Sequence, residues 1–279
     1  MKHAYSIATP DVDPAAKVFG LSGNFEENLR RIKAAGFEGV ELITCRPKDL
    51  DMGWLEDCLQ RHSLDAVMIA TGEIAGAEGL SLSSPDRRTR EKTVERFSQF
   101  TELAARLGAD INIGRSRGTL LPGEEKKTTD RNLVDSFRRI SENAAGAGVR
   151  YALEPVAPQL MNYINNVEEV MEYIVLTGYD NFSYMLDTQH MFLGEPDPLE
   201  VIRRCGKGAL HVHLTDSQRN YPGSGEIPFD RFIEAFAKAG YDRAFSHESL
   251  PVPDMYTCME RSMAHIKPIL ERYYRKGGE

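Results

Sequence analysis

Short apolar runs rich in β-forming residues alternate with longer amphipathic segments along the whole chain. Such alternation is typical of parallel βα units, in which a helix returns the chain to the same end of the sheet after each strand. The expected strands begin at intervals of about 34 residues, enough for one strand, one helix and two loops. We therefore predict a single (β/α)8 TIM barrel, one domain over residues 1–279. The expected strands begin near His3, Gly39, Leu64, Ala109, Arg150, Phe182, Gly208 and Ala244.

The longest internal helical pattern runs over residues 86–107. Ser83 and Ser84 precede it, and a serine hydroxyl can accept a hydrogen bond from the free amides of a first helical turn. We expect one of these serines to cap the helix, with Pro85 in its first turn.

Composition limits the partners of such a barrel. With 34 basic and 42 acidic side chains, the formal net charge is −8, which gives nucleic acid no overall electrostatic attraction. No apolar stretch approaches the roughly 18 residues that a membrane span requires. The four cysteines are too far apart for a CxxC redox pair or a zinc knuckle, which favours a reducing compartment. We expect a cytoplasmic protein with neither a nucleic-acid nor a membrane partner.

Two segments that follow expected strands are longer and richer in glycine than a simple connection requires. They span residues 71–85 and 114–128. In a parallel barrel, loops that follow strands lie on the C-terminal face, where active sites are built. Both segments are therefore candidate walls of a substrate site, and ordinary surface loops are the alternative.

Four consecutive expected strands each carry an acid or a histidine at their carboxyl end. These residues are Glu154, Asp187, His213 and Glu248. Taken singly, such a residue is more often a hydrogen-bonded structural group than a functional one. Because the strand ends of a parallel barrel converge, however, all four side chains are expected to meet at one end of it. Carboxylate oxygens with one imidazole suit Mn²⁺, Co²⁺, Mg²⁺ or Zn²⁺, whereas a thiolate site finds no support.

The motifs around these residues resemble those of the sugar phosphate isomerase/epimerase superfamily, the xylose isomerase-like TIM barrels, and within it the ketose 3-epimerase branch. The resemblance extends over nearly the whole chain, and the ordered set from Glu154 onward is specific to the superfamily. It rests on Gly36-Phe37-Glu38-Gly39-Val40-Glu41, Leu153-Glu154-Pro155, Asp187-Thr188-Gln189-His190, His211-Val212-His213-Leu214-Thr215-Asp216, Pro222-Gly223-Ser224-Gly225-Glu226-Ile227-Pro228 and His247-Glu248.

The resemblance implies a role for each matching position. Glu154, Asp187, His213 and Glu248 would bind one divalent metal, with Mn²⁺ expected first. His190 and Arg219 would hold a ketose beside it. Glu41 and His211 match positions that either contact substrate or lie behind the metal ligands. A homodimer or homotetramer is the assembly that the resemblance suggests.

The implied reaction is inversion at carbon 3 of a ketose or keto-sugar derivative. A proton next to a carbonyl is a poor acid, so the metal would stabilise the enediolate as a Lewis acid. Glu154 and Glu248 arrive from separate strands, so one can remove the proton and the other can return it on the opposite face. Arg219 can hold the carbonyl side and His190 can donate to a hydroxyl.

The sequence departs from the ketose 3-epimerase pattern at Leu160, where many members place a glutamate that touches substrate. Asn162 or Asn165 could substitute for it. The segment from Gly114 to Gly118 also adds Arg115 and Arg117, whose guanidinium groups could bind a phosphate or a carboxylate. A sugar acid, a sugar phosphate and a bulky glycoside therefore remain open as substrates.

Other functions compete with epimerisation. Aldose–ketose isomerisation and dehydration of a keto-inositol or related keto sugar would use the same metal and carboxylates. An apurinic endonuclease of this fold requires additional histidines at strand ends that here read Ile69-Ala70-Thr71 and Ile113-Gly114-Arg115. A barrel that binds a sugar without turnover is the non-enzyme alternative, which the presence of both glutamates disfavours. The run Pro222-Gly223-Ser224-Gly225-Glu226 lacks the lysine of a phosphate-binding loop, so we interpret it as a turn that carries Arg219 over the site.

Overall fold

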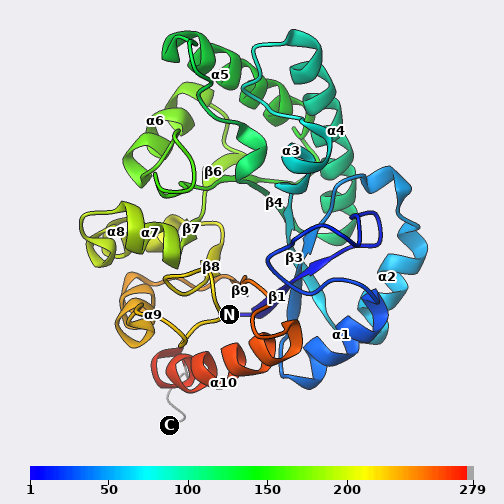
Figure 1. Ribbon diagram of the computed structural model, residues 1–279, viewed down its shortest axis with the longest axis vertical. Helices are drawn as coiled ribbons and strands as arrows, with labels where there is room; N and C mark the ends of the chain where they lie inside the picture. Colours follow the sequence, from blue (N-terminus) through cyan, green and yellow to red (C-terminus); the bar gives the residue numbers. More distant parts are fainter. Residues whose placement is uncertain (275–279) are drawn as a thin grey trace.

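A single sheet of parallel strands forms the centre of the molecule in the computed structural model, which describes residues 1–274 (Figure 1). Its hydrogen-bonded order is β6-β5-β4-β3-β2-β1-β9-β8-β7, and every recorded strand pair is parallel. The strands are β1 (His3–Ala8), β2 (Gly39–Ile43), β3 (Asp65–Ala70), β4 (Asp110–Ile113), β5 (Tyr151–Leu153), β6 (Phe182–Tyr184), β7 (Leu186–Asp187), β8 (Val212–Leu214) and β9 (Phe245–His247).

Met185 closes this sheet into a barrel. It alone separates β6 from β7, the two strands at the ends of the sheet order, so the sixth expected strand is present in two parts. Its amide donates to the carbonyl of Leu153 on one side at 3.1 Å, whereas the amide of Leu186 donates to the carbonyl of His211 on the other side at 3.1 Å. The predicted eight-position barrel is therefore confirmed, with a change of hydrogen-bonding neighbour within its sixth position.

Helices surround the strands on the outside (Figure 1). Most of them follow a strand and return the chain to the amino end of the next one, as the alternating pattern predicts. They are α1 (Phe25–Ala34), α2 (Met52–Arg61), α3 (Glu73–Glu78), α4 (Arg87–Leu107), α5 (Lys126–Asn143), α6 (Val167–Thr177), α7 (Thr188–Gly194), α8 (Pro198–Cys205), α9 (Phe229–Ala239) and α10 (Met255–Tyr274), with 3₁₀ turns at Pro47–Asp49, Arg115–Arg117 and Gly206–Gly208.

Two local expectations are corrected. The cap of α4 is Asp86, whose carboxylate accepts from the amides of Arg88 and Thr89 at 3.3 and 3.1 Å, and neither Ser83 nor Ser84 caps the helix. The Ser84 hydroxyl instead accepts from the amide of Asp86 at 3.3 Å, and Pro85 precedes the cap and does not lie in the first turn. The seventh strand begins at Val212, not near Gly208, because Gly206–Gly208 forms a 3₁₀ turn.

Side-chain alternation divides the strands between two environments. In β2, Val40 and Leu42 belong to the main apolar core shared with the helices, whereas Glu41 between them contacts one histidine of β8 and one histidine just before it. Met68, which pairs with Glu41 in the strand register, belongs to a second, smaller apolar cluster with Met185 and two further residues. Burial of one such large side chain stabilises the fold by about 1.5–3 kcal/mol.

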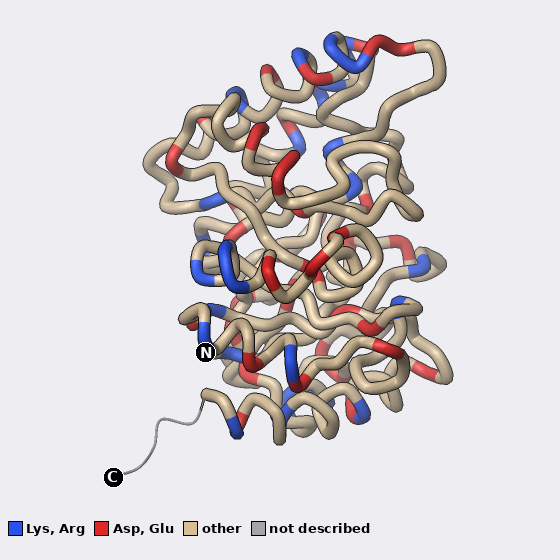
Figure 2. Tube along the Cα trace, turned by 90° about the vertical axis from the view of Figure 1, so that its left-hand side faces the viewer, with Lys and Arg blue, Asp and Glu red and all other residues tan. Residues whose placement is uncertain are grey.

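Lys and Arg positions are interspersed with Asp and Glu positions along the face drawn in Figure 2. Among residues 1–274, no helix combines the length and the apolar character that crossing a bilayer demands.

Candidate active site

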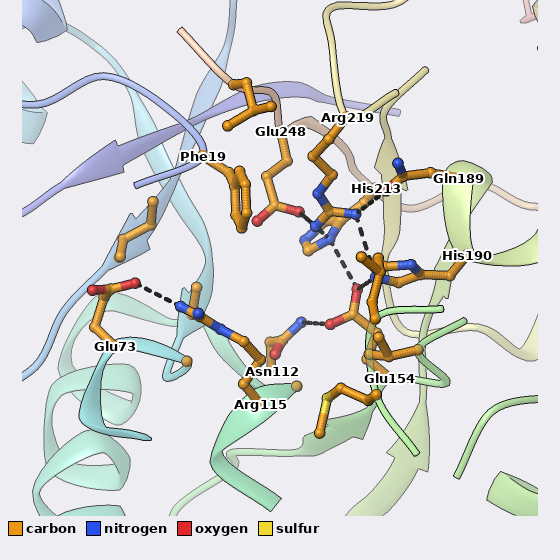
Figure 3. A pocket seen from close by; sticks show the side chains of 18 residues that line it. Phe19, Glu73, Asn112, Arg115, Glu154, Gln189, His190, His213, Arg219 and Glu248 are labelled. Atoms are coloured by element: carbon orange, nitrogen blue, oxygen red, sulfur yellow. Dashed lines mark hydrogen bonds and ion pairs between the residues drawn. The ribbon is translucent and has the colours of Figure 1, made fainter. Parts of the chain in front are cut away.

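A cavity of about 410 Å³ opens at the carboxyl ends of the strands (Figure 3). We call it the central cavity, and its volume falls within the range of small-molecule sites. It is lined by residues from both of the long segments that the sequence suggested as walls, including Gly72 and Arg115. Five further predicted site residues line it, namely Glu154, His190, His213, Arg219 and Glu248.

The structure brings the four predicted metal ligands together. Glu154 follows β5 directly, Asp187 ends β7, His213 lies in β8 and Glu248 follows β9. The Nδ1 atom of His213 lies 3.2 Å from Glu154 Oε1, 3.5 Å from Asp187 Oδ2 and 3.0 Å from Glu248 Oε2. One imidazole nitrogen therefore faces three carboxylate oxygens from three different strand ends.

These residues fit a divalent cation. Asp187, His213 and Glu248 each offer a ligand atom within 4.8 Å of the others, as do Glu154, Asp187 and His190. Glu154 Oε1 and His213 Nδ1 are buried without a hydrogen-bond partner among the described residues. Buried polar atoms of this kind are rarely left unpaired, and carboxylate oxygens with imidazole nitrogen form a donor set for a hard or borderline cation.

Glu41 fixes the orientation of His213. Both of its carboxylate oxygens lie 3.0 Å from His213 Nε2, and one also lies 3.1 Å from His211 Nε2. Burial works to raise the pKa of Glu41, but the charges and hydrogen bonds of His213 and His211 lower it well below its usual range. The ionised Glu41 therefore binds Nε2 of His213. The other ring nitrogen, Nδ1, is then directed at the three carboxylates.

Arg219 lies over the same carboxylates. Its guanidinium group is 3.0 Å from Asp187 Oδ2 and 2.5 Å from Glu248 Oε2, and it stacks on the ring of Phe19 at 4.9 Å. The residue has a left-handed backbone, with φ of +61°. The following glycine-rich turn is held by Asp216, whose carboxylate accepts from the amides of Gly223, Gly225 and Ile227 at 2.8–3.1 Å. Asp216 also holds the backbone of Arg219, whose amide donates to the Asp216 carbonyl at 2.9 Å.

His190 lies beside Arg219, whose guanidinium group is 3.3 Å from His190 Nε2. Its amide donates to Asp187 Oδ1 at 2.9 Å, because Asp187 caps the short helix α7. Its Nε2 is 3.9 Å from Glu154 Oε1, and its buried Nδ1 has no hydrogen-bond partner among the described residues. Burial lowers the pKa of His190, despite the opposing charge of Asp187. A neutral imidazole can donate or accept one hydrogen bond at each nitrogen.

Several predicted positions differ from expectation. Glu41 and His211 do not line the central cavity, which argues against direct contact with substrate. They bond to each other behind the predicted metal ligands, which was the other position expected for them. Arg115 does line it, but its guanidinium group pairs with Glu73 at 2.9 Å. Asn162 and Asn165 bind backbone carbonyls and do not line the cavity, so neither substitutes for the missing glutamate at Leu160.

The expectation that Arg117 offers its guanidinium group to a ligand is wrong. Arg117 is fully buried and donates to the carbonyl oxygens of Gly114, Glu154, Tyr163 and Ile164 at 2.7–3.1 Å. These four carbonyls belong to the segments that follow β4 and β5, so the side chain joins two walls of the site.

The lining residues that were not predicted include Phe19, Asn112 and Gln189. Asn112 Nδ2 donates to Glu154 Oε2 at 3.4 Å, and Gln189 Oε1 accepts from Arg219 at 3.0 Å. Asn112 could have been found from the sequence, because it is a polar residue between two isoleucines of the strand Asp110–Ile113. Phe19 lies in an irregular segment, and its sequence gives no comparable signal.

The comparisons with known proteins agree with this architecture. Residues 29–267 match the model of the family described as xylose isomerase-like TIM barrel. A ketose 3-epimerase of Arthrobacter globiformis is 25% identical, over 80% of this chain and 76% of that protein. An L-ribulose 3-epimerase of Mesorhizobium japonicum is 29% identical, over 80% of this chain and 75% of that protein. A solved structure of an L-ribulose 3-epimerase superposes with a TM-score of 0.81 at 24% identity, covering 97% and 95% of the two chains.

The chain therefore belongs to the xylose isomerase-like TIM barrel family. The relatives are sugar epimerases, which supports the prediction that this chain is an enzyme of the isomerase type.

Proposed function

We propose that this protein is a divalent-metal-dependent sugar epimerase that inverts carbon 3 of a ketose or keto-sugar derivative. The observation that carries the proposal is the position of Glu154 and Glu248, whose carboxylates approach His213 Nδ1 from β5 and β9 at 3.2 and 3.0 Å. Ketose 3-epimerases among the relatives support the same reaction class.

The two glutamates supply the proton chemistry. Both line the central cavity, from strand ends that are separated around the barrel wall, so a sugar between them presents opposite faces to the two carboxylates. One carboxylate removes the proton next to the carbonyl, and the other, in its protonated form, returns a proton to the other face. Inversion follows because removal and return occur on opposite faces of the same carbon.

Glu154, Asp187, His213 and Glu248 would hold the metal ion. When bound there, a divalent cation supplies a Lewis acid that stabilises negative charge on the oxygens of the sugar. Asp187 is fully buried and also caps α7, so it is placed to serve as a ligand and not as a base.

Arg219 and His190 would orient the sugar. The guanidinium group presents fixed donors toward the cavity and remains charged at any physiological pH. Its stacking on Phe19 and its bonds to Gln189 and Glu248 limit its motion. His190 Nε2 lies 3.9 Å from Glu154 Oε1 and 3.3 Å from the Arg219 guanidinium group, so the imidazole would contact a sugar hydroxyl group at this point.

Proton exchange in D₂O tests this proposal. The Mn²⁺-loaded protein is incubated with a panel of ketoses and keto-sugar derivatives, and deuterium is located by NMR. Label at carbon 3 with inversion is the expected result. Label at carbon 1 would indicate aldose–ketose isomerisation instead, and loss of water from the sugar would indicate a dehydratase. Absence of exchange with every sugar would contradict all three reactions.

Other features of the proposal stay predictions. They are the choice of Mn²⁺, assembly into a homodimer or homotetramer, a cytoplasmic location without nucleic-acid or membrane partners, and a single domain over residues 1–279.

A further inference from the structure

A second hollow of about 510 Å³ adjoins the central cavity. We call it the outer groove. Arg115, Leu160 and Met161 line both spaces, so the two hollows meet at these three side chains. The remaining walls of the outer groove come from residues 75–85 and 118–121.

The outer groove has the chemistry of a carbohydrate site. Hydroxyl groups of Ser81, Ser83 and Thr119 line it, together with the apolar side chains of Leu121 and Leu160. Leu121 and Leu160 are among the few large apolar side chains that the described residues leave exposed, at 45% and 55%. Sugar rings present hydroxyl groups at their edges and C–H groups on their faces, and a lining of this mixed kind matches both.

Hydrogen bonds within the protein hold the walls of the outer groove in place. The side-chain amide of Asn162 exchanges two hydrogen bonds with the backbone of Leu120, at 2.9 and 3.2 Å, which joins the walls on either side. The amide of Ser83 donates to the carbonyl of Arg117, itself held in the core. At Gly118, where φ is +92°, a Cβ atom would lie 2.1 Å from Ser83 Oγ, so glycine lets the backbone approach the serines. Such preorganisation lowers the entropic cost of binding.

Charge argues against a phosphate in this groove. Its charged lining residue is Arg115, and Arg115 pairs with the largely buried Glu73 at 2.9 Å (Figure 3). An anion at Arg115 would therefore compete with Glu73 and be repelled by it. A neutral polar group avoids this conflict.

We propose that the outer groove binds a glycosyl substituent of the substrate, so that the preferred substrate is a glycosylated keto sugar and not a free ketose or a sugar phosphate. The proposal rests on the epimerase function, which would place the reacting sugar in the central cavity. Leu160, at the junction of the two spaces, then packs against the glycosidic linkage.

Calorimetric titration of the metal-loaded full chain tests this assignment. The ligands are fructose, its 6-O-glucosyl and 4-O-galactosyl derivatives, and fructose 6-phosphate. We expect at least one glycosylated ketose to bind about tenfold more tightly than fructose, the gain of one net hydrogen bond of ordinary strength. The phosphate ester is expected to bind no more tightly than fructose.

The variant Gly76→Trp fills the groove. Gly76 is an exposed residue of α3 that lines the outer groove but not the central cavity, and a Cβ there meets no atom within 4 Å. Gly76→Trp should abolish the tenfold gain and leave fructose binding unchanged. Gly53→Trp, at an exposed position of α2 outside the groove, is the matched control and should retain the gain.

Binding of both glycosylated ketoses no more tightly than fructose, or a gain that survives in Gly76→Trp, overturns the proposal, as does tightest binding of the phosphate. The outcome is independent of the D₂O experiment. Tighter glycoside binding without proton exchange would remove the epimerase function alone, and exchange without tighter binding would remove the groove assignment alone.

Discussion

His213 presents its Nε2 atom to both carboxylate oxygens of Glu41, at 3.0 Å each. Both side chains are almost completely buried. Glu41 thereby selects which nitrogen of the ring faces Glu154, Asp187 and Glu248, although it does not itself reach the cavity.

Replacement of Glu41 by glutamine should therefore weaken metal binding. The neutral amide cannot hold the ring with a charged acceptor, so we expect the affinity for Mn²⁺ to fall about 10- to 100-fold. Direct metal titration by calorimetry measures this without reference to turnover. Glu95→Gln, at an exposed position of α4, is the control, and equal affinities for both variants would contradict the role of Glu41.

Removal of either proposed base should stop the reaction. Glu154→Gln and Glu248→Gln keep the shape of each side chain but cannot accept a proton, so we expect loss of turnover by at least about 10³-fold at saturating metal. Circular dichroism spectra should match those of the unchanged protein. A variant that retains ordinary activity would exclude that glutamate as a base.

Arg117→Met should destabilise the fold. The change leaves four buried carbonyl oxygens without a donor, and we expect the free energy of unfolding to fall by about 3 kcal/mol. Arg87→Met removes an ion pair with Glu91 in which both side chains are exposed, and should cost less than about 1 kcal/mol. Denaturant titrations of the two variants provide the comparison, and similar losses would show that Arg117 contributes no more than a surface pair.

Asp130 should make stability depend on acid pH. Burial works to raise its pKa, but hydrogen bonds from Tyr163, Tyr173 and Lys126 lower the pKa below its usual value of 3.8. A depressed pKa in the folded state stabilises the protein above 3.8, and this contribution is lost as the pH falls through the folded value. Asp130→Asn should be about 1–2 kcal/mol less stable at neutral pH. Its deficit in denaturant titrations should shrink below pH 3.8, and a constant deficit would contradict this.

The fold and the four central site residues could be predicted from the alternation of strand and helix patterns and from the residues at the strand ends. Alternating strands and helices indicate the barrel because each pattern reflects the local backbone geometry. Glu154, Asp187, His213 and Glu248 could be grouped in advance because the carboxyl ends of parallel strands must converge.

The rest depends on contacts between distant segments. Arg117 reads as a loop cation, and its burial follows only from carbonyl groups as far away as Ile164. Phe19 becomes part of the site because Arg219, 200 positions later, stacks on it. The cap at Asp86 was missed because three polar candidates lie within four residues, and backbone angles decide among them.

The break at Met185 also determines how the site spans the sheet. Glu154 belongs to the edge that ends at β6, whereas Asp187, His213 and Glu248 belong to the edge that begins at β7. A cation bound by all four would link these two edges of the sheet. Metal binding would therefore stabilise the barrel at the point where β6 and β7 do not pair with each other.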